Sequence, residues 1–178
     1  GWVAELRRIT VLFVNLPGVT HTTPIEKAQE LMHDLQTTIY QYEGSVNKLS
    51  VDDKGVTFIG VMGLPPLAHE DDPTRGLQAA LALHTCLKKL GLKTAIGVTT
   101  GRAYCGSVGS HRRCEYTIMG DMVNLAARLM QAAPDSILCD APTHDAAQEG
   151  FAFEKLEPIK VKGKAELIQA YRPLEQAL

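Results

Sequence analysis

The stretch Glu115-Tyr-Thr-Ile-Met-Gly-Asp-Met-Val-Asn-Leu-Ala-Ala-Arg128 carries the most specific pattern in this sequence. Its first part completes a strand predicted over 113–119, and the glycine that follows opens a helix that ends before Pro134. Asn124 and Arg128 are four residues apart, so their side chains share one helix face. An amide one turn from a permanent cation suits a ligand with a polar ring and a phosphoryl group. On spacing alone, a solvated helix face is the alternative.

The segments on either side alternate between strands and helices. Upstream, one helix begins at the capping box Thr23-Pro24-Ile25-Glu26 and another at Asp72-Pro73, and strands are predicted at 9–15, 45–51, 56–61 and 93–100. Downstream, the pattern predicts a short helix at 141–148 and strands at 136–139, 151–156 and 167–171. This order, without a dividing linker, predicts one α+β domain over residues 1–178. Its fold is ferredoxin-like, with a mainly antiparallel sheet and helices packed on one face.

The composition excludes several classes of protein. The chain has 178 residues, of which 45% are hydrophobic and 21% charged, as in a globular domain. No apolar run approaches the roughly 18 residues of a membrane span. A net charge of -2 argues against nucleic acid as a partner. The cysteines have no metal-ligand spacing, so we expect a reduced, cytoplasmic protein; they are Cys86, Cys105, Cys114 and Cys139. Because the chain begins at Gly1 without a leader pattern, we expect a domain of a longer polypeptide.

Two further segments bear groups that suit a polyphosphate or a metal ion. Lys48 precedes the turn Asp52-Asp53, and carboxylates at a hairpin tip can bind Mg²⁺, although such turns are commonly only solvated. The segment Val161-Lys-Gly-Lys164 could place an ammonium group on a polyphosphate. The chain contains no G-x-x-x-x-G-K-[ST], H-E-x-x-H or G-x-S-x-G motif. A P-loop site and the zinc- and serine-hydrolase classes are therefore not supported.

Taken together, these segments resemble the catalytic domain of class III nucleotidyl cyclases. The resemblance covers about residues 5 to 173, in the family's order. It rests on Arg8-Ile-Thr-Val-Leu-Phe-Val-Asn15, Gly44-Ser-Val-Asn-Lys48 with its acidic hairpin, Ile96-Gly-Val-Thr-Thr-Gly101, Glu115–Arg128 and Val161-Lys-Gly-Lys164. Within the family, the chain is most similar to the second of the two tandem cyclase domains of bicarbonate-responsive soluble adenylyl cyclases. Glu5-Leu-Arg-Arg8 and Phe13-Val-Asn-Leu16 carry that closer similarity, together with the lysine-containing segment at 44–48.

The resemblance implies an active site in the groove between two cyclase domains that meet head to tail. In the family, two aspartates of one domain bind two metal ions, and the other domain recognises the nucleotide. Carried onto this sequence, the resemblance implies that Lys48 and Thr117 read adenine, Asn124 orients the ribose, Arg128 stabilises charge on the α-phosphoryl group, and Lys162 or Lys164 holds the leaving pyrophosphate. The implied activity is an adenylate cyclase, a phosphorus-oxygen lyase that converts ATP into cyclic AMP.

One position departs from the family's pattern. Asn15 stands where the first metal aspartate is expected, and a neutral amide is a weaker ligand for Mg²⁺ or Mn²⁺ than a carboxylate. The second aspartate corresponds to Asp52, which follows Val51 in place of the usual glycine. We therefore expect the metal to be held mainly by a partner cyclase domain, and the isolated domain to be weakly active or inactive. A non-catalytic regulatory module and a weakly active homodimer are the alternatives.

Overall fold

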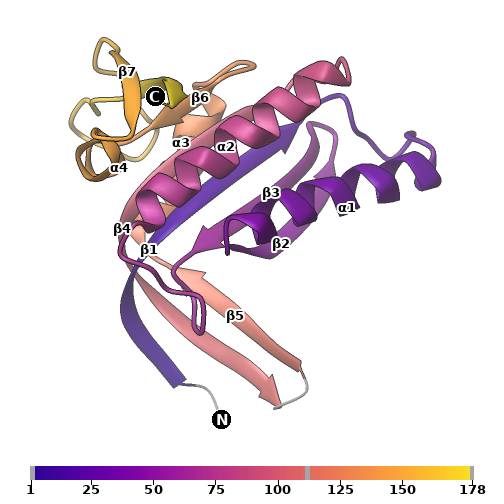
Figure 1. Cartoon of the computed structure of the whole chain (residues 1–178), viewed down its shortest axis with the longest axis horizontal. Helices are drawn as coiled ribbons and strands as arrows, with labels where there is room; N and C mark the ends of the chain where they lie inside the picture. The colour runs from indigo at the N-terminus through magenta and orange to yellow at the C-terminus, as the bar shows by residue number, and fades with distance from the viewer. Residues whose placement is uncertain (1–2, 111–112, 177–178) are drawn as a thin grey trace.

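In the described part of the chain, eight strands form one sheet that runs through the molecule (Figure 1). In chain order, they are β1 (Val3–Leu16), β2 (Ser45–Asp52), β3 (Gly55–Met62), β4 (Ala95–Ser110), β5 (Arg113–Met119), β6 (Ile137–Cys139), β7 (Phe151–Lys155) and β8 (Tyr171–Gln176). Their order in the sheet is β2-β3-β1-β4-β6-β8-β7, and β5 pairs with β4 beside this path. Among the described strands, only β4 and β6 pair in parallel. The predicted α+β class and the mainly antiparallel sheet are confirmed.

Among the residues that the structure describes, four helices accompany the sheet: α1 (Ile25–Gln41), α2 (Asp72–Lys89), α3 (Asp121–Gln131) and α4 (Ala141–Ala147). This computed structural model describes residues 3–110 and 113–176, with side chains within 4–106 and 117–174. Within those residues, no helix combines the length and the apolar character that crossing a membrane requires. The helices and strands occur in the chain order that the sequence predicts.

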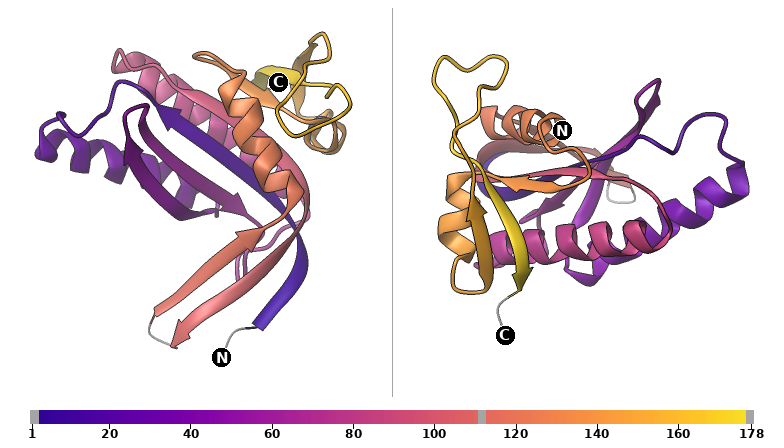
Figure 2. Two further views of the ribbon diagram at one scale, coloured as in Figure 1. Left: turned by 180° about the vertical axis from the view of Figure 1, so that it is seen from behind. Right: turned by 90° about the horizontal axis from the view of Figure 1, so that it is seen from above.

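Both faces of the central strand β1 are apolar, so helices cover the sheet on both sides. Leu12 and Val14 belong to a buried cluster with residues of α1, α2 and α4. Ile9 and Val11 belong to a second cluster, which includes Ala126 of α3. Because successive side chains of a strand point to opposite faces, α3 packs opposite the other helices. The predicted single helical face therefore describes α1, α2 and α4, while α3 lies across the sheet from them, as the view from above in Figure 2 shows.

Two local predictions are wrong, each for a local reason. The predicted capping box does not form, because Thr23 Oγ1 accepts from Thr20 N in the preceding turn (3.0 Å) and α1 begins at Ile25 without a side-chain cap. The last strand begins at Tyr171 rather than at Leu167. The residues just before β8 find one isolated bridge instead of a ladder of hydrogen bonds, so they do not extend the strand.

The lower parts of β1, β4 and β5 project beyond the helices as an arm (Figures 1 and 2). The arm arises because β4 has 16 residues, long enough to pair with β1 along most of its length and with β5 at its far end. Thr117 lies on β5, opposite Gly106 in the β4–β5 ladder. The β4–β5 pairing thus positions one predicted substrate-binding residue on the strand that also contacts β2.

Candidate active site

Helix α3, which bears the two predicted catalytic residues, is seated directly on the backbone of β4. A Cβ atom added at Gly97 would lie 2.1 Å from Ala126 O, so only glycine fits between strand and helix. Thr99 Oγ1, two residues along β4, donates to Met122 O (2.7 Å) in the first turn of α3. The helix is thereby fixed along the strand as well as against it.

A hollow of about 290 Å³ lies between α3 and the loop that joins β7 to β8. Its lining, which defines the α3 hollow below, is Asp121, Asn124, Leu125, Arg128, Val161, Lys162, Gly163 and Lys164. Asn124 is exposed, whereas Arg128 is half-buried and donates from Nη1 to Gln131 Oε1 (3.1 Å). The fold thus brings the predicted amide, guanidinium and both predicted lysines to one place, although the lysines follow more than 30 residues after Arg128 in the sequence.

The two lysines of the α3 hollow are not equivalent. Lys164 Nζ donates to Asp121 Oδ2 in an ion pair, and the lysine side chain is 29% exposed. Lys162 is exposed and forms no ion pair with any residue in the described part of the chain. The ammonium group of Lys162 is therefore the one that is available to an anionic ligand.

Asp121 is a site residue that the sequence interpretation did not assign. Asp121 lies inside the most specific motif, directly after Gly120. An acidic side chain in the first turn of a helix was the feature of the sequence that could have pointed to it. Its partner, Lys164, is 43 residues away, a separation that no spacing rule connects. Only the packing of the β7–β8 loop against α3 reveals the pair.

A second hollow, of about 840 Å³, opens at the edge where β1, the β2–β3 hairpin and the end of α3 meet. Asn15, Asp52 and Lys54 line this edge hollow, and so do Arg128 and Lys162. The two hollows therefore share the guanidinium and the available lysine. Asn15 and Asp52, which the sequence places at the metal position, therefore line the same hollow as Arg128 within a single chain.

The residues of the edge hollow do not form a site for two divalent ions. Asn15 Nδ2 donates to Lys54 O (3.2 Å), Val56 O (3.3 Å) and Thr57 Oγ1 (3.3 Å). These three oxygen atoms therefore accept hydrogen bonds from an amide nitrogen and are not directed at a cation. Asp52 Oδ1 accepts from Lys54 N (2.8 Å). In the described ranges, no three His, Cys, Asp or Glu side chains gather as a metal site. This donor set does not match the oxygen shell that Mg²⁺ prefers.

The two predicted adenine-reading residues lie on strands that contact each other, β2 and β5. Lys48 is exposed and follows an irregularity in β2, where the pairing with β3 shifts between Val46 and Lys48. Such bulges redirect the following side chain. Thr117 is exposed on β5. Neither residue lines the α3 hollow or the edge hollow, so the single chain presents them on an open surface.

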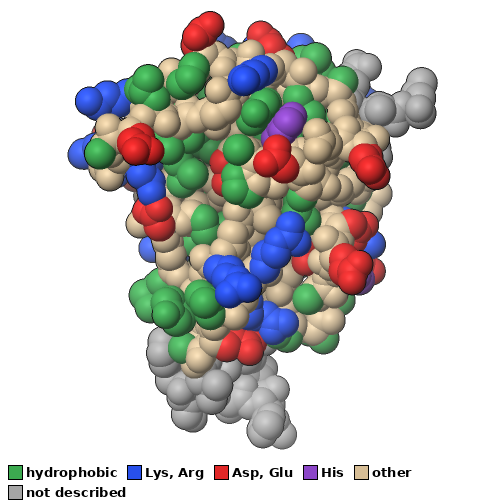
Figure 3. Space-filling view, turned by 90° about the vertical axis from the view of Figure 1, so that its left-hand side faces the viewer, with side chains coloured by type: hydrophobic (Ala, Val, Ile, Leu, Met, Phe, Trp, Pro, Cys, Tyr) green, Lys and Arg blue, Asp and Glu red, His purple; other side chains and the backbone are tan. Residues whose placement is uncertain are grey.

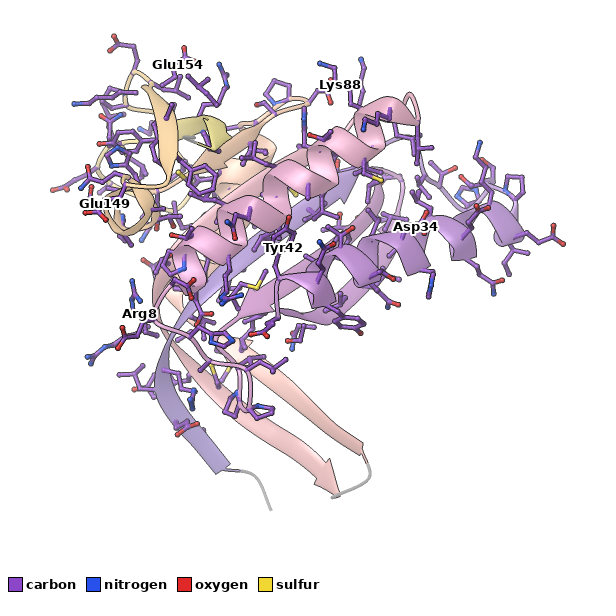
Figure 4. The ribbon with its side chains drawn as sticks, viewed as in Figure 1. Arg8, Asp34, Tyr42, Lys88, Glu149 and Glu154 are labelled. Atoms are coloured by element: carbon purple, nitrogen blue, oxygen red, sulfur yellow. The ribbon has the colours of Figure 1, made fainter. Side chains whose placement is uncertain are left out.

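A larger hollow, of about 1230 Å³, lies along α2 and contains none of the predicted site residues. Asp34, Tyr42 and Lys88, labelled in Figure 4, are among its lining residues. The size of this hollow does not by itself indicate a binding or catalytic site, because its lining combines aliphatic side chains with separate charged groups. The predicted residues identify the two smaller hollows as the candidate site.

An arginine pair stands outside both hollows. Arg8 of β1 and Arg102 of β4 are directly opposite each other in the ladder, and both are exposed. Figure 3 shows Lys and Arg side chains gathered on the side of the molecule where Figure 4 places Arg8. Neither arginine forms an ion pair with a described residue. Like charges that face each other across a ladder destabilise it, which gives this pair a measurable consequence.

The carboxyl group of Asp140 is buried at the start of α4. Asp140 is the N-cap of α4, and its Oδ1 accepts from Thr143 N (3.1 Å) and Thr143 Oγ1 (2.6 Å). Hydroxyl contacts continue from Thr143 to Thr100 (2.9 Å) and from Thr100 to Thr10 (3.0 Å). Burial raises the pKa of Asp140 to about 6, although the Thr143 hydrogen bonds act in the opposite direction.

Comparison with known proteins decides the family. A family profile described as "Adenylate and Guanylate cyclase catalytic domain" matches residues 3–172. The chain belongs to this cyclase family. Human adenylate cyclase type 10 (Homo sapiens) is 35% identical over 177 residues, which cover 93% of this chain and 11% of the human protein. The chain thus spans about a ninth of the length of this relative. The predicted similarity to class III cyclases, and to soluble adenylyl cyclase in particular, is confirmed.

Solved cyclase structures share the fold. The adenylyl cyclase CyaB from P. aeruginosa has a TM-score of 0.85 at 21% identity, with 97% of this chain and 96% of that chain covered. The dimeric guanylyl cyclase domain of the RhoGC fusion protein from the aquatic fungus Blastocladiella emersonii has a TM-score of 0.82 at 16% identity, with 98% and 99% covered. At these identities the likeness establishes the cyclase fold alone.

Proposed function

We propose that this domain is the substrate-reading half of a two-domain adenylate cyclase, which forms cyclic AMP and pyrophosphate from ATP together with a partner cyclase domain. One observation carries the proposal. Asn124, Arg128 and Lys162 converge on the α3 hollow, while the Asn15 amide nitrogen is directed at oxygen atoms where a metal-binding carboxylate is expected. The residues assigned to the ribose and the phosphates thus lie close together, whereas Asn15 and Asp52 at the edge hollow do not provide the donor set of a two-metal site.

The α3 hollow suits the charge that develops in cyclisation. The ribose 3′-oxygen forms a bond to the α-phosphorus and its proton is lost, while the bond from the α-phosphorus to the pyrophosphate oxygen breaks. Negative charge then grows on the phosphoryl oxygens and on the leaving pyrophosphate. Arg128, already half-buried and held by Gln131, offers a fixed guanidinium to the phosphoryl oxygens. Asn124, one turn earlier, orients the ribose, and Lys162 receives the pyrophosphate.

Adenine recognition is assigned to Lys48 and Thr117 on the contacting strands β2 and β5. A lysine donates to a ring nitrogen, and a threonine hydroxyl can accept from the exocyclic amine of adenine. Guanine presents a carbonyl in place of that amine and so requires the opposite hydrogen-bonding pattern. The base would lie on the open surface of β2 and β5, where a second domain can cover it.

The partner is a cyclase domain that contributes two metal-binding aspartates across a head-to-tail interface. The non-canonical dimeric guanylyl cyclase domain from Blastocladiella emersonii, which shares the fold, supports pairing of such domains in general, whereas the head-to-tail arrangement rests on the family resemblance. Divalent Mg²⁺ or Mn²⁺ would be held mainly by the partner, because Asn15 and Asp52 do not provide a matching donor set. We also propose a cytoplasmic location, since Cys86, Cys105 and Cys139 are free thiols.

A second candidate is a non-catalytic module that pairs with a cyclase domain and regulates it. The hydrogen bonds of Asn15 favour it, because they give the amide a structural role at the hairpin base. The two candidates differ in what Arg128 does. In the catalytic half, the guanidinium stabilises the transition state; in the regulatory module, its removal leaves turnover unchanged.

Turnover measurements separate these candidates. Cyclic AMP would be measured with Mn²⁺ and ATP for the domain alone at rising concentration, and then after mixing with a cyclase domain that has both metal aspartates. We expect little activity alone and clear activity on mixing. Arg128→Ala should lower turnover of the mixture by about 10²–10³-fold. The control is Arg172→Ala, which removes a surface ion pair with Glu154 outside both hollows.

Three outcomes would contradict the proposal. Activity of the domain alone would show that its own edge binds the metal, and a steep rise of that activity with concentration would support the weakly active homodimer. Unchanged turnover with Arg128→Ala would support the regulatory module. Association of the two domains without any cyclic AMP production would do so as well.

A further inference from the structure

We propose that the Asp121–Lys164 ion pair is a latch that positions Lys162 beside Arg128, which makes Asp121 a positioning residue for the pyrophosphate side of the reaction. The inference rests on the proposed function for its catalytic meaning, while the latch itself is a property of this fold. Asp121 comes from the first turn of α3, and Lys164 from the β7–β8 loop. Their contact is an ion pair that joins this loop to the helix that bears Arg128.

The backbone around Lys162 explains why a latch at Lys164 would control it. Lys164 N donates to Val161 O (3.3 Å), which closes a four-residue turn. Gly163 has φ 87°, the conformation that the third residue of a type II turn requires. Lys162 is thus the second residue of a tight turn and projects from it. Burial of Val161 (4% exposed) fixes one end of the turn, and the ion pair of Lys164 fixes the other.

The latch has an electrostatic consequence as well. Asp121 lines the same hollow as Arg128 and Lys162, so an uncompensated carboxylate there would repel a polyphosphate and attract both cations away from it. Lys164 neutralises this carboxylate. The pair therefore leaves Arg128 and Lys162 as the net charge that the hollow presents to an anion.

The exposure of the pair sets the size of the effect. The Asp121 side chain is 75% exposed and that of Lys164 is 29% exposed, so solvent screens the attraction. Ion pairs of this kind change equilibria by about fivefold at most. The effect should also shrink as salt rises from low to high concentration, because the charges are accessible to ions.

The test uses the mixed, active pair of domains and compares Lys164→Met, Asp121→Asn, the double variant and a matched control, Lys160→Met. Lys160 is an exposed lysine just before the turn and lines neither hollow. The readouts are the KM for ATP and the inhibition constant of pyrophosphate. Lys164→Met should raise both by about threefold to fivefold, because it frees the carboxylate of Asp121. The double variant should recover toward Asp121→Asn, since no charge remains uncompensated, and Lys160→Met should match the unmodified domain.

A second measurement tests the latch without turnover. Trypsin cleaves after Lys162 only when the turn opens, so Asp121→Asn should increase cleavage there at low salt, while Lys160→Met should not. Unchanged cleavage would overturn the latch. A double variant as impaired as Lys164→Met would overturn the electrostatic role given to Lys164, because the loss would then not come from the freed carboxylate of Asp121. If the unmodified mixture makes no cyclic AMP but the cleavage difference is found, the proposed function fails and the latch stands.

Discussion

Replacing Gly97 by alanine tests whether the close approach of α3 to β4 sets the geometry of the site. The added Cβ would lie 2.1 Å from Ala126 O and 2.6 Å from Met130 N, whereas ordinary contacts begin at 3.4 Å. Both atoms belong to the α3 backbone and cannot turn aside as a side chain does. The helix would therefore have to retreat by more than about 1 Å, which is an overpacking strain that typically costs about 1–3 kcal/mol.

The retreat should affect turnover more than folding. Asn124 and Arg128 move with α3, and a displacement of about 1 Å can reduce a rate by about 10²-fold. Urea unfolding of the domain would measure the stability loss, and cyclic AMP formation in the mixed pair would measure turnover. Gly18→Ala is the matched control, because Gly18 is exposed and the nearest neighbour of an added Cβ atom would lie 3.7 Å away. The control should change stability by no more than about 0.5 kcal/mol.

Two results would refute this reasoning. If Gly97→Ala unfolded at the same urea concentration as Gly18→Ala, the strand and helix would have room that the structure does not show. If Gly97→Ala were destabilised but kept full turnover in the mixed pair, the position of α3 would not control turnover, and the catalytic role proposed for Asn124 and Arg128 would be contradicted.

Two further predictions concern charge away from the hollows. Burial raises the pKa of Asp140 from 3.8 to about 6, so the folded state holds this proton more tightly than the unfolded state. The contribution of Asp140 to the free energy of unfolding therefore falls as the pH rises from about 4 to 6. Above pH 6 the contribution remains unfavourable. Asp140→Asn keeps the oxygen acceptor for Thr143 and should be more stable than the unmodified domain at pH 7.5 by on the order of 3 kcal/mol. Urea titrations should show that this difference vanishes near pH 4. Parallel curves of stability against pH for the two proteins would contradict the prediction. Arg102→Glu should stabilise the domain by about 0.5–1 kcal/mol at low salt, because the like-charged cross-strand pair with Arg8 becomes an attractive pair. A gain in stability that does not change with salt concentration would exclude an electrostatic cause.

Local sequence signals gave most of the secondary structure. The turn between 52 and 55, the helix start at Asp72-Pro73 and the end of α3 before Pro134 follow from residues that restrict the backbone. Where a signal had a competing partner nearby, the prediction was wrong. Thr23 could cap α1 but instead accepts a hydrogen bond from the preceding turn.

The candidate site divides in the same way. Asn124 and Arg128 were recognisable together because a helix places residues four apart on one face, and Asn15 was recognisable as a departure because a side chain's ligand chemistry depends on its own atoms. The choice between Lys162 and Lys164 could not be made from the sequence, because it depends on which lysine meets Asp121.

The sequence by itself determined the family, the order of the elements and the presence of an amide, Asn15, where the resemblance places a metal-binding carboxylate, since these depend on residue identity and on short-range geometry. The tertiary structure decided that α3 covers the opposite face of the sheet, that the Asn15 amide is directed at backbone oxygens, and that one lysine is paired while the other is available. Each of these is a contact between segments far apart in the chain. Such contacts are set by how two packed surfaces fit, and no periodicity or motif within either segment encodes that fit.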